Sequence, residues 1–133
     1  MRRLGRWILG LVALIGTALG VAALYVLLYE PDRTSYPVRG IDVSHHQKEI
    51  DWRKVARDDV AFAFIKATEG GDHRDTRFAR NWREAQAAGV KVGAYHFFTF
   101  CRSGLDQARN FLGALGPETG TLPAALDLEF GGN

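Results

Sequence analysis

The sequence predicts an α/β domain with a mainly parallel sheet, preceded by one transmembrane helix. Residues 7–29 contain no charged side chain, which is typical of a membrane segment. From residue 38 onward, short apolar runs alternate with segments of helical periodicity, and strands that alternate with helices favour right-handed crossovers and parallel pairing. The chain has a single cysteine, Cys101, so no internal disulfide can form and stability must come from a packed core.

The apolar segment over residues 7–29 is long enough to cross a bilayer. At about 1.5 Å per residue it reaches about 34 Å. Arg2, Arg3 and Arg6 precede it, and the positive-inside rule therefore places residues 1–6 in the cytoplasm and everything after Tyr29 outside. A cleaved signal peptide of a secreted protein is the alternative, with a small-residue site at residues 18–20. We expect an uncleaved anchor because the apolar run continues past that site.

The basic charge of the chain lies in its N-terminal tip. The whole sequence has 17 Lys and Arg against 15 Asp and Glu, whereas residues 30–133 have 14 against 15. No basic stripe interleaved with aromatic residues follows the apolar segment, so we expect no nucleic-acid partner.

Strands and helices are expected in alternation after a proline-bounded linker at residues 30–39. Apolar runs predict strands at 38–43, 60–67, 90–98 and 124–129, with a loop at 68–75. Helices are expected after the capping residues Asp51, Thr76 and Ser103. The second helix ends at Gly89 and buries Phe78, Trp82 and Ala85. The third is expected to bury Leu105, Ala108, Phe111, Leu112 and Leu115.

Polar side chains gather where the predicted strands end. Ligands of parallel sheets bind beyond the carboxyl ends of the strands, so these residues form a candidate site. The polar and aromatic residues at the four strand ends are Asp42; Lys66, Thr68 and Glu69; Tyr95, His96 and Phe97; and Asp127 and Glu129.

Asp127 and Glu129 are the strongest candidates for acid/base chemistry. In an extended strand, positions i and i+2 face the same side, about 6.6 Å apart. Two carboxylates held close together in a partly buried site leave one protonated beside an anion near neutral pH. A solvated strand end is the alternative interpretation of this short motif.

Four ordered motifs resemble the lysozymes of glycoside hydrolase family 25, the Chalaropsis-type muramidases. They are GIDVSHHQ at 40–47, IKATEG at 65–70, GAYHF at 93–97 and ALDLE at 125–129. The resemblance implies an irregular, flattened β/α barrel of the glycosidase type. It also implies cleavage of the β-1,4 bond between N-acetylmuramic acid and N-acetylglucosamine in peptidoglycan. It covers residues 40–129, about the first half of such a domain, so we expect a C-terminally truncated catalytic domain over residues 40–133.

The resemblance assigns the proton donor to Glu129, its partner carboxylate to Asp127, and a further catalytic acid to Asp42. Whether an enzyme nucleophile or the acetamido group of the substrate attacks stays open. The family has another acidic residue late in its domain, beyond the end of this sequence. Strands one and four of a flat sheet are about 14 Å apart, so Asp42 can join Glu129 only if the sheet curls.

Tyr95, Lys66, Glu69 and His96 are candidate substrate-binding residues. Tyr95 is a candidate floor for a sugar subsite. Lys66 and Glu69 are expected to form an ion pair, either one that supports the site or an ordinary surface pair, and His96 is expected to position other groups.

Two other functional classes compete with the hydrolase. An incomplete barrel could retain the glycan groove as a non-catalytic peptidoglycan-binding module. Paired histidines, His45 and His46, could serve a metal-dependent deacetylase, but adjacent strand residues point opposite ways and no zinc-type carboxylate spacing accompanies them. We therefore expect no metal and no cofactor. The expected location is the bacterial inner membrane, with a single pass and the domain outside.

Overall fold

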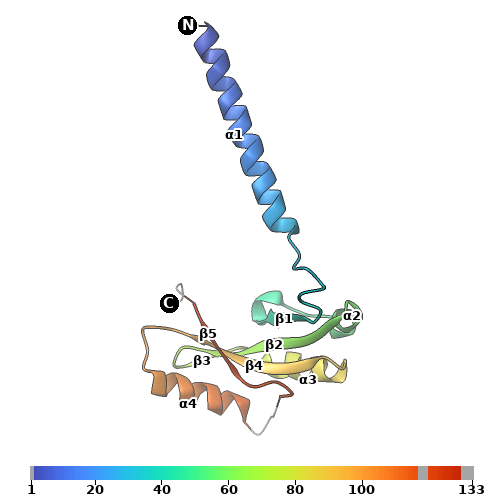
Figure 1. The fold of residues 1–133 in the computed structure, drawn as a ribbon. Helices are drawn as coiled ribbons and strands as arrows, with labels where there is room; N and C mark the ends of the chain where they lie inside the picture. The colour runs from blue at the N-terminus through green and yellow to red at the C-terminus, as the bar shows by residue number, and fades with distance from the viewer. Residues whose placement is uncertain (1, 117–119, 130–133) are drawn as a thin grey trace. The chain divides into compact units, whose positions relative to one another are not determined.

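The computed structural model describes residues 2–116 and 120–129 and separates Met1–Pro37 from Val38–Asn133 as two units (Figure 1). The first unit is built on helix α1 (Arg2–Leu28). Residues Arg6–Leu28 are long and apolar enough to cross a membrane, a test that a signal sequence near an N-terminus also passes. Their side chains are exposed throughout. An apolar helix therefore exists where the sequence predicted one, and its role as an anchor stays a prediction.

The second unit is built on a mainly parallel sheet, as the sequence predicted. Strands β1 (Arg39–Val43), β2 (Val60–Glu69), β4 (Lys91–Phe98) and β5 (Ala125–Leu128) pair in parallel in the order β1-β2-β4-β5. The two-residue strand β3 (His73–Arg74) pairs antiparallel with the end of β2. The expected loop over residues 68–75 is therefore partly wrong, because β2 continues to Glu69 and the chain then folds back along it.

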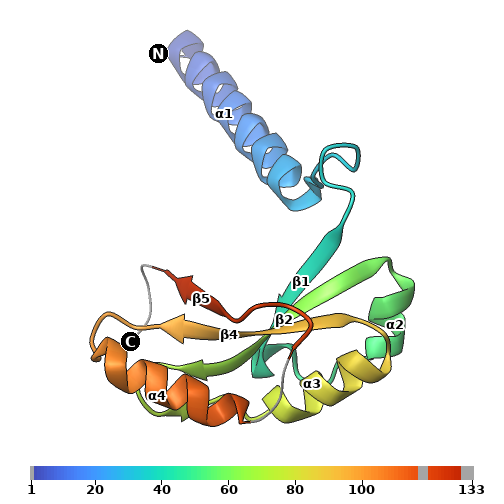
Figure 2. The same cartoon turned by 60° about the horizontal axis from the view of Figure 1, so that its bottom comes forward.

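Three α-helices cover one face of this sheet (Figure 2). They are α2 (Trp52–Arg57), α3 (Phe78–Ala87) and α4 (Gly104–Leu115), and a 3-10 helix η1 (His45–Gln47) follows β1. The side chains of Asp51 and Ser103 cap α2 and α4 as expected, each accepting a backbone N–H at 3.1 Å. Thr76 does not cap α3. Its N-cap residue is Arg77, which makes no side-chain capping bond.

The core lies between the helices and alternate residues of the strands. Ile65 and Val92 are fully buried at its centre. From α3, the side chains of Phe78, Trp82 and Ala85 enter this core, as its periodicity predicted. Because strand side chains alternate between faces, the residues between these core positions lie on the opposite, helix-free face.

Helix α4 contacts the sheet through a face that matches the predicted one only in part. As expected, Phe111 is buried and Leu115 packs against the core. Leu105 and Leu112 are 61% and 68% exposed. The buried side chains of α4 are Gln107, Asn110 and Phe111. The prediction was wrong for Leu105 and Leu112 because two polar residues on the inward face satisfy backbone groups of the loops, a role that hydrophobic periodicity does not report.

Gln107 is the centre of a buried hydrogen-bond network. Its side-chain amide donates to the backbone oxygens of Thr99 at 2.9 Å and Arg102 at 3.2 Å. Its Oε1 accepts from the backbone N–H of Thr99 at 2.9 Å and lies 3.2 Å from Nε2 of His96. Gln107 therefore fixes the loop between β4 and α4 against the end of β4.

We expect Gln107→Met to destabilise the fold by about 1–3 kcal/mol, the cost of leaving buried polar groups without partners. Methionine has a similar length but cannot replace the lost hydrogen bonds. Chemical denaturation followed by circular dichroism measures the change. Gln86→Met, at an exposed position of α3, is the matched control and should lie within about 0.5 kcal/mol of the parent. Equal stability of the two variants would contradict the structural role of the network.

Candidate functional site

The helix-free face of the sheet forms a hollow lined by carboxylates from both ends of the strand order. The hollow has a volume of about 290 Å³, and Asp42 on β1, Asp127 on β5 and Glu129 just after β5 line it together with Phe64 and Tyr95. Two strands separate β1 from β5. The shared hollow therefore requires a curled sheet, which is the geometry that the sequence required if Asp42 was to join Glu129.

Two phenylalanine rings cover this face beside the carboxylates. Gly93 is paired with Phe64, and a Cβ at Gly93 would lie 2.6 Å from the Phe64 ring. Gly40 is paired with Phe62, and a Cβ there would clash with that ring. Each glycine thus leaves room for an aromatic ring to lie across the neighbouring strand, and the ring of Phe64 adds an apolar surface to the hollow.

Tyr95 is the phenol within this hollow, and it is 9% exposed. Burial raises the pKa of Tyr95 well above its ordinary value, and the negative charges of Asp42 and Asp127 raise it further. The hydroxyl is therefore neutral over the whole physiological range and is available as a hydrogen-bond donor beside the acids.

Lys66 and Glu69 lie on the same face because β2 contains an irregularity. The register with β4 shifts between Lys66 and Thr68, so Ala67 is an extra residue in the strand. In a regular strand, residues three apart face opposite sides, whereas here the bulge turns both onto one face. Nζ of Lys66 reaches Oε2 of Glu69 at 2.6 Å and lies 4.6 Å from the centre of the Phe97 ring. The hydrogen bond from Lys66 holds the pKa of Glu69 below its ordinary value.

His96 lies on the other face of the sheet and is 1% exposed. Its Nδ1 is 2.7 Å from Oγ1 of Thr68, and its Nε2 is 3.2 Å from Oε1 of Gln107. Oε1 of Gln107 can only accept, so Nε2 carries the proton and Nδ1 accepts from the threonine hydroxyl. Both ring nitrogens are thus engaged inside the protein. This burial agrees with the expectation that His96 positions other groups, and its place among the substrate-binding residues stays a prediction.

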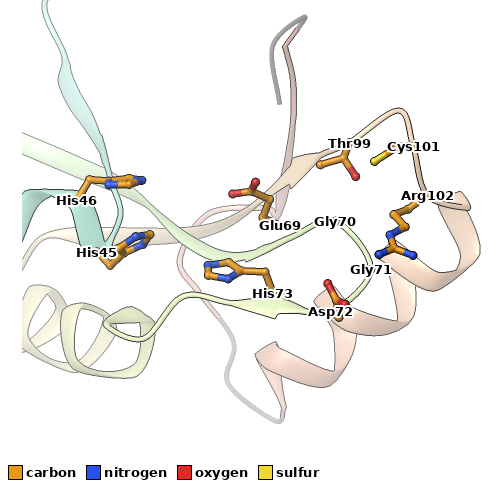
Figure 3. Close-up of a pocket in the computed structure, with 10 residues that line it drawn as sticks. All are labelled: His45, His46, Glu69, Gly70, Gly71, Asp72, His73, Thr99, Cys101 and Arg102. Atoms are coloured by element: carbon orange, nitrogen blue, oxygen red, sulfur yellow. The ribbon is translucent and has the colours of Figure 1, made fainter. Parts of the chain in front are cut away.

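A second, larger hollow of about 560 Å³ lies beyond the carboxyl ends of β1, β2 and β4 (Figure 3). Three imidazole rings gather on one side of it. The ring of His45 lies 4.0 Å from that of His46 and 5.9 Å from that of His73, centre to centre. The expectation that His45 and His46 point in opposite directions is wrong, because they lie in the 3-10 helix η1 and not in a strand. The remaining lining residues are Glu69, Gly70, Gly71, Asp72, Thr99, Cys101 and Arg102.

Asp75 holds this side of the hollow in place, although it was not among the predicted site residues. Its side chain is fully buried, and it accepts hydrogen bonds from the backbone N–H groups of His45 and Arg77 and from Nδ1 of His45, each at 2.8 Å. Burial acts to raise the pKa of Asp75, but these hydrogen bonds outweigh it and the pKa lies below its ordinary value. One feature of the sequence could have indicated this role. Asp75 stands two residues before Arg77, the N-cap of α3, and an aspartate at that spacing favours an Asx turn.

Cys101 is exposed at this hollow. Within residues 2–116 and 120–129, no three His, Cys, Asp or Glu side chains are grouped so that they could hold a metal ion. The described residues therefore give the metal-dependent deacetylase hypothesis no support.

The curled parallel sheet, with helices on one face and acids at the strand ends, is that of a glycoside hydrolase domain. The chain belongs to the glycosyl hydrolases of family 25, whose sequence profile matches residues 41–133. Lysozyme M1 of Streptomyces globisporus is 45% identical to it over 96 residues, which cover 69% of this chain and 33% of that protein.

Two solved structures show the same fold. A family 25 glycosyl hydrolase from Bacillus anthracis is 42% identical, with a TM-score of 0.68 over 72% of this chain and 44% of that chain. A family GH25 lysozyme from Aspergillus fumigatus is 36% identical, with a TM-score of 0.63 over 71% and 47% of the two chains. This chain therefore spans between about a third and a half of the length of these relatives.

Proposed function

We propose that this protein is a lysozyme that hydrolyses the β-1,4 bond between N-acetylmuramic acid and N-acetylglucosamine in peptidoglycan. The observation that carries the proposal is the convergence of Asp42, Asp127 and Glu129 on one hollow from opposite ends of the sheet. Membership of family 25 and the lysozyme relatives support it. A glycosidase needs a proton donor and at least one anion around the scissile bond, and this hollow supplies three carboxyl groups.

In the proposed mechanism, Glu129 protonates the leaving glycosidic oxygen. It is exposed at the end of β5, where a sugar can reach it. Asp127 is half-buried on the same strand, and together with Asp42 it stabilises the positive charge that develops on the sugar ring. The neutral hydroxyl of Tyr95 donates a hydrogen bond to a carboxylate or to a sugar oxygen, and so helps to orient the groups. No metal and no cofactor enters these steps.

The Lys66–Glu69 pair is proposed to complete the substrate-binding face. The pair is largely shielded from solvent and lies beside the Phe97 ring, whose register partner on β5 is Asp127. A charge pair fixed by a bulge next to the acids gives a rigid polar surface for glycan hydroxyl groups. His96 supports this surface from the other side of the sheet through Thr68.

The activity is tested by incubating the purified protein with peptidoglycan and measuring new reducing ends. We expect products that end in a reducing N-acetylmuramic acid, identified by mass spectrometry after borohydride reduction, and unchanged activity in the presence of EDTA. Reducing N-acetylglucosamine ends would contradict the proposed bond. Glycan binding without any new reducing ends would contradict the proposed hydrolysis and favour a non-catalytic binding module.

We also propose the domain organisation that the N-terminal sequence favours. Residues 1–6 would lie in the cytoplasm, residues 7–29 would anchor the protein in the bacterial inner membrane, and residues 30–39 would link the anchor to the family 25 domain outside. Helix α1 and the arginines before its apolar part support this organisation. It also brings the domain to the side of the membrane where peptidoglycan lies.

When the protein is expressed in a Gram-negative bacterium, it should sediment with membranes and resist extraction by salt, because the uncharged segment 7–29 binds a bilayer by burial and not by charge. Protease should digest the domain only after the outer membrane is permeabilised. Soluble periplasmic protein that begins near residue 21 would instead show a cleaved signal peptide. N-terminal sequencing of the membrane and soluble fractions distinguishes the two results.

A further inference from the structure

The second hollow contains charges of both signs close to the proposed catalytic acids. On its lining, Glu69 and Asp72 are acidic, Arg102 is basic, and three imidazole rings add polar ring nitrogens. A neutral sugar would leave these charges without partners. A ligand that carries both carboxylates and an amine complements them, because each of its charges lies near an opposite charge of the lining.

The register of the sheet gives the separation between the two hollows. Glu69 on β2 is paired with Phe97 on β4, and Phe97 is paired with Asp127 on β5. These positions are thus two strand spacings apart, about 10 Å. All three side chains lie on the helix-free face, so a bound molecule can extend from one hollow to the other along the sheet surface. An extended peptide spans about 3.3–3.6 Å per residue, so about three residues cover this separation.

Peptidoglycan carries a group of this length and chemistry. Its N-acetylmuramic acid bears a short peptide arm on the lactyl oxygen, with free carboxylates and, where a diamino acid is present, a free amine. We propose that the second hollow binds this peptide arm while the sugar lies in the hollow of Asp42, Asp127 and Glu129. This inference rests on the proposed function, because it takes the position of the sugar from it.

Arg102 is the residue that should contribute most to recognition. A guanidinium binds a carboxylate with two parallel hydrogen bonds, a geometry that lysine does not provide. Figure 3 shows Arg102 opposite the histidine cluster, with Glu69 between them. Gln107 donates a hydrogen bond to the backbone oxygen of Arg102. The side-chain carbons of Arg102 lie beside Gly71, and a Cβ at Gly71 would be 3.9 Å from them. The loop that presents this charge is therefore fixed before the ligand arrives.

The test compares two purified ligands that differ only in the peptide. One is the N-acetylglucosamine–N-acetylmuramic acid disaccharide with its tetrapeptide, and the other is the same disaccharide after the peptide has been removed by an amidase. Isothermal titration should show about tenfold tighter binding of the peptide-bearing form. Equal affinities would overturn the inference.

Two substitutions locate the effect. Arg102→Gln should abolish most of the tenfold preference, and Arg102→Lys should restore only part of it. Arg109→Gln, on an exposed arginine of α4, is the matched control and should retain the full preference. Thermal melting checks that the variants are folded. An Arg102→Gln variant that is folded and keeps the preference, or that loses affinity for both ligands equally, would overturn the inference.

Cleavage of peptide-free glycan strands separates this inference from the proposed function. Hydrolysis of peptide-free and peptide-bearing strands with equal kcat/KM would overturn the inference and leave the proposed function standing. Arg102-dependent binding of the peptide-bearing ligand without cleavage of either substrate would support the inference and contradict the proposed function.

Discussion

Replacing Glu129 with glutamine is expected to lower the turnover of peptidoglycan by at least about 100-fold, the scale of lost general acid catalysis. The amide has nearly the same size as the carboxyl group but has no proton to transfer to the leaving oxygen. Binding should change little, because Asp42, Asp127 and Tyr95 still line the hollow. The release of reducing ends under single-turnover conditions gives the rate, and co-sedimentation with insoluble peptidoglycan gives the binding.

Glu84→Gln is the matched control for this experiment. Glu84 lies on α3, on the opposite side of the sheet, and pairs with Arg80 at the surface. It should turn over peptidoglycan at the parental rate. A Glu129→Gln variant within threefold of the parent would remove Glu129 from the role of proton donor.

Replacing Asp75 with alanine is expected to lower the free energy of unfolding by about 1–3 kcal/mol for each buried donor that it leaves without an acceptor. The substitution leaves the backbone N–H groups of His45 and Arg77 without their acceptor and releases the His45 ring. Urea denaturation at pH 7 measures the loss. Asp58→Ala, at an exposed aspartate after α2, should change stability by less than about 0.5 kcal/mol.

The difference between the parent and Asp75→Ala should depend on pH. The pKa of Asp75 is below its ordinary value of 3.8 in the folded state, so between that value and the folded pKa the unfolded chain binds more protons than the folded protein. The contribution of Asp75 is therefore fully present above about pH 4 and is lost as the pH falls through the folded pKa. A difference that stays constant from pH 7 to pH 2, or that grows on acidification, would contradict this account of the buried carboxylate.

Local sequence patterns were sufficient to predict most of the sheet. The apolar run over residues 60–67 and the run over 90–98 lie at its centre and are covered on one face by helices, so their composition reflects burial directly. Asp51 and Ser103 correctly predicted the starts of α2 and α4, because capping is a local interaction. The family resemblance then indicated which strand ends would carry the acids.

Other features of the site are encoded in no local pattern, although the expected Lys66–Glu69 ion pair is present. The bulge at Ala67 depends on the pairing of β2 with β4, and it decides that Lys66 and Glu69 share a face. The same pairing places Thr68 against His96 on the helix side. The burial of Asn110 on α4 could not be predicted for the same reason. Its side-chain amide donates to the backbone oxygens of Gly70 at 3.1 Å and His73 at 3.0 Å, and these residues are far away in the sequence.

The most direct test of the central claim is a crystal structure of the Glu129→Gln variant with an intact peptidoglycan tetrasaccharide. We expect the scissile glycosidic oxygen to lie about 2.6–3.2 Å from the side chain at position 129, the reach of a general acid. Asp42 and Asp127 should both border the sugar whose bond is to be broken. A tetrasaccharide bound elsewhere on the domain, or bound with Asp42 remote from the scissile bond, would contradict the claim that the curled sheet unites these three acids in one catalytic site.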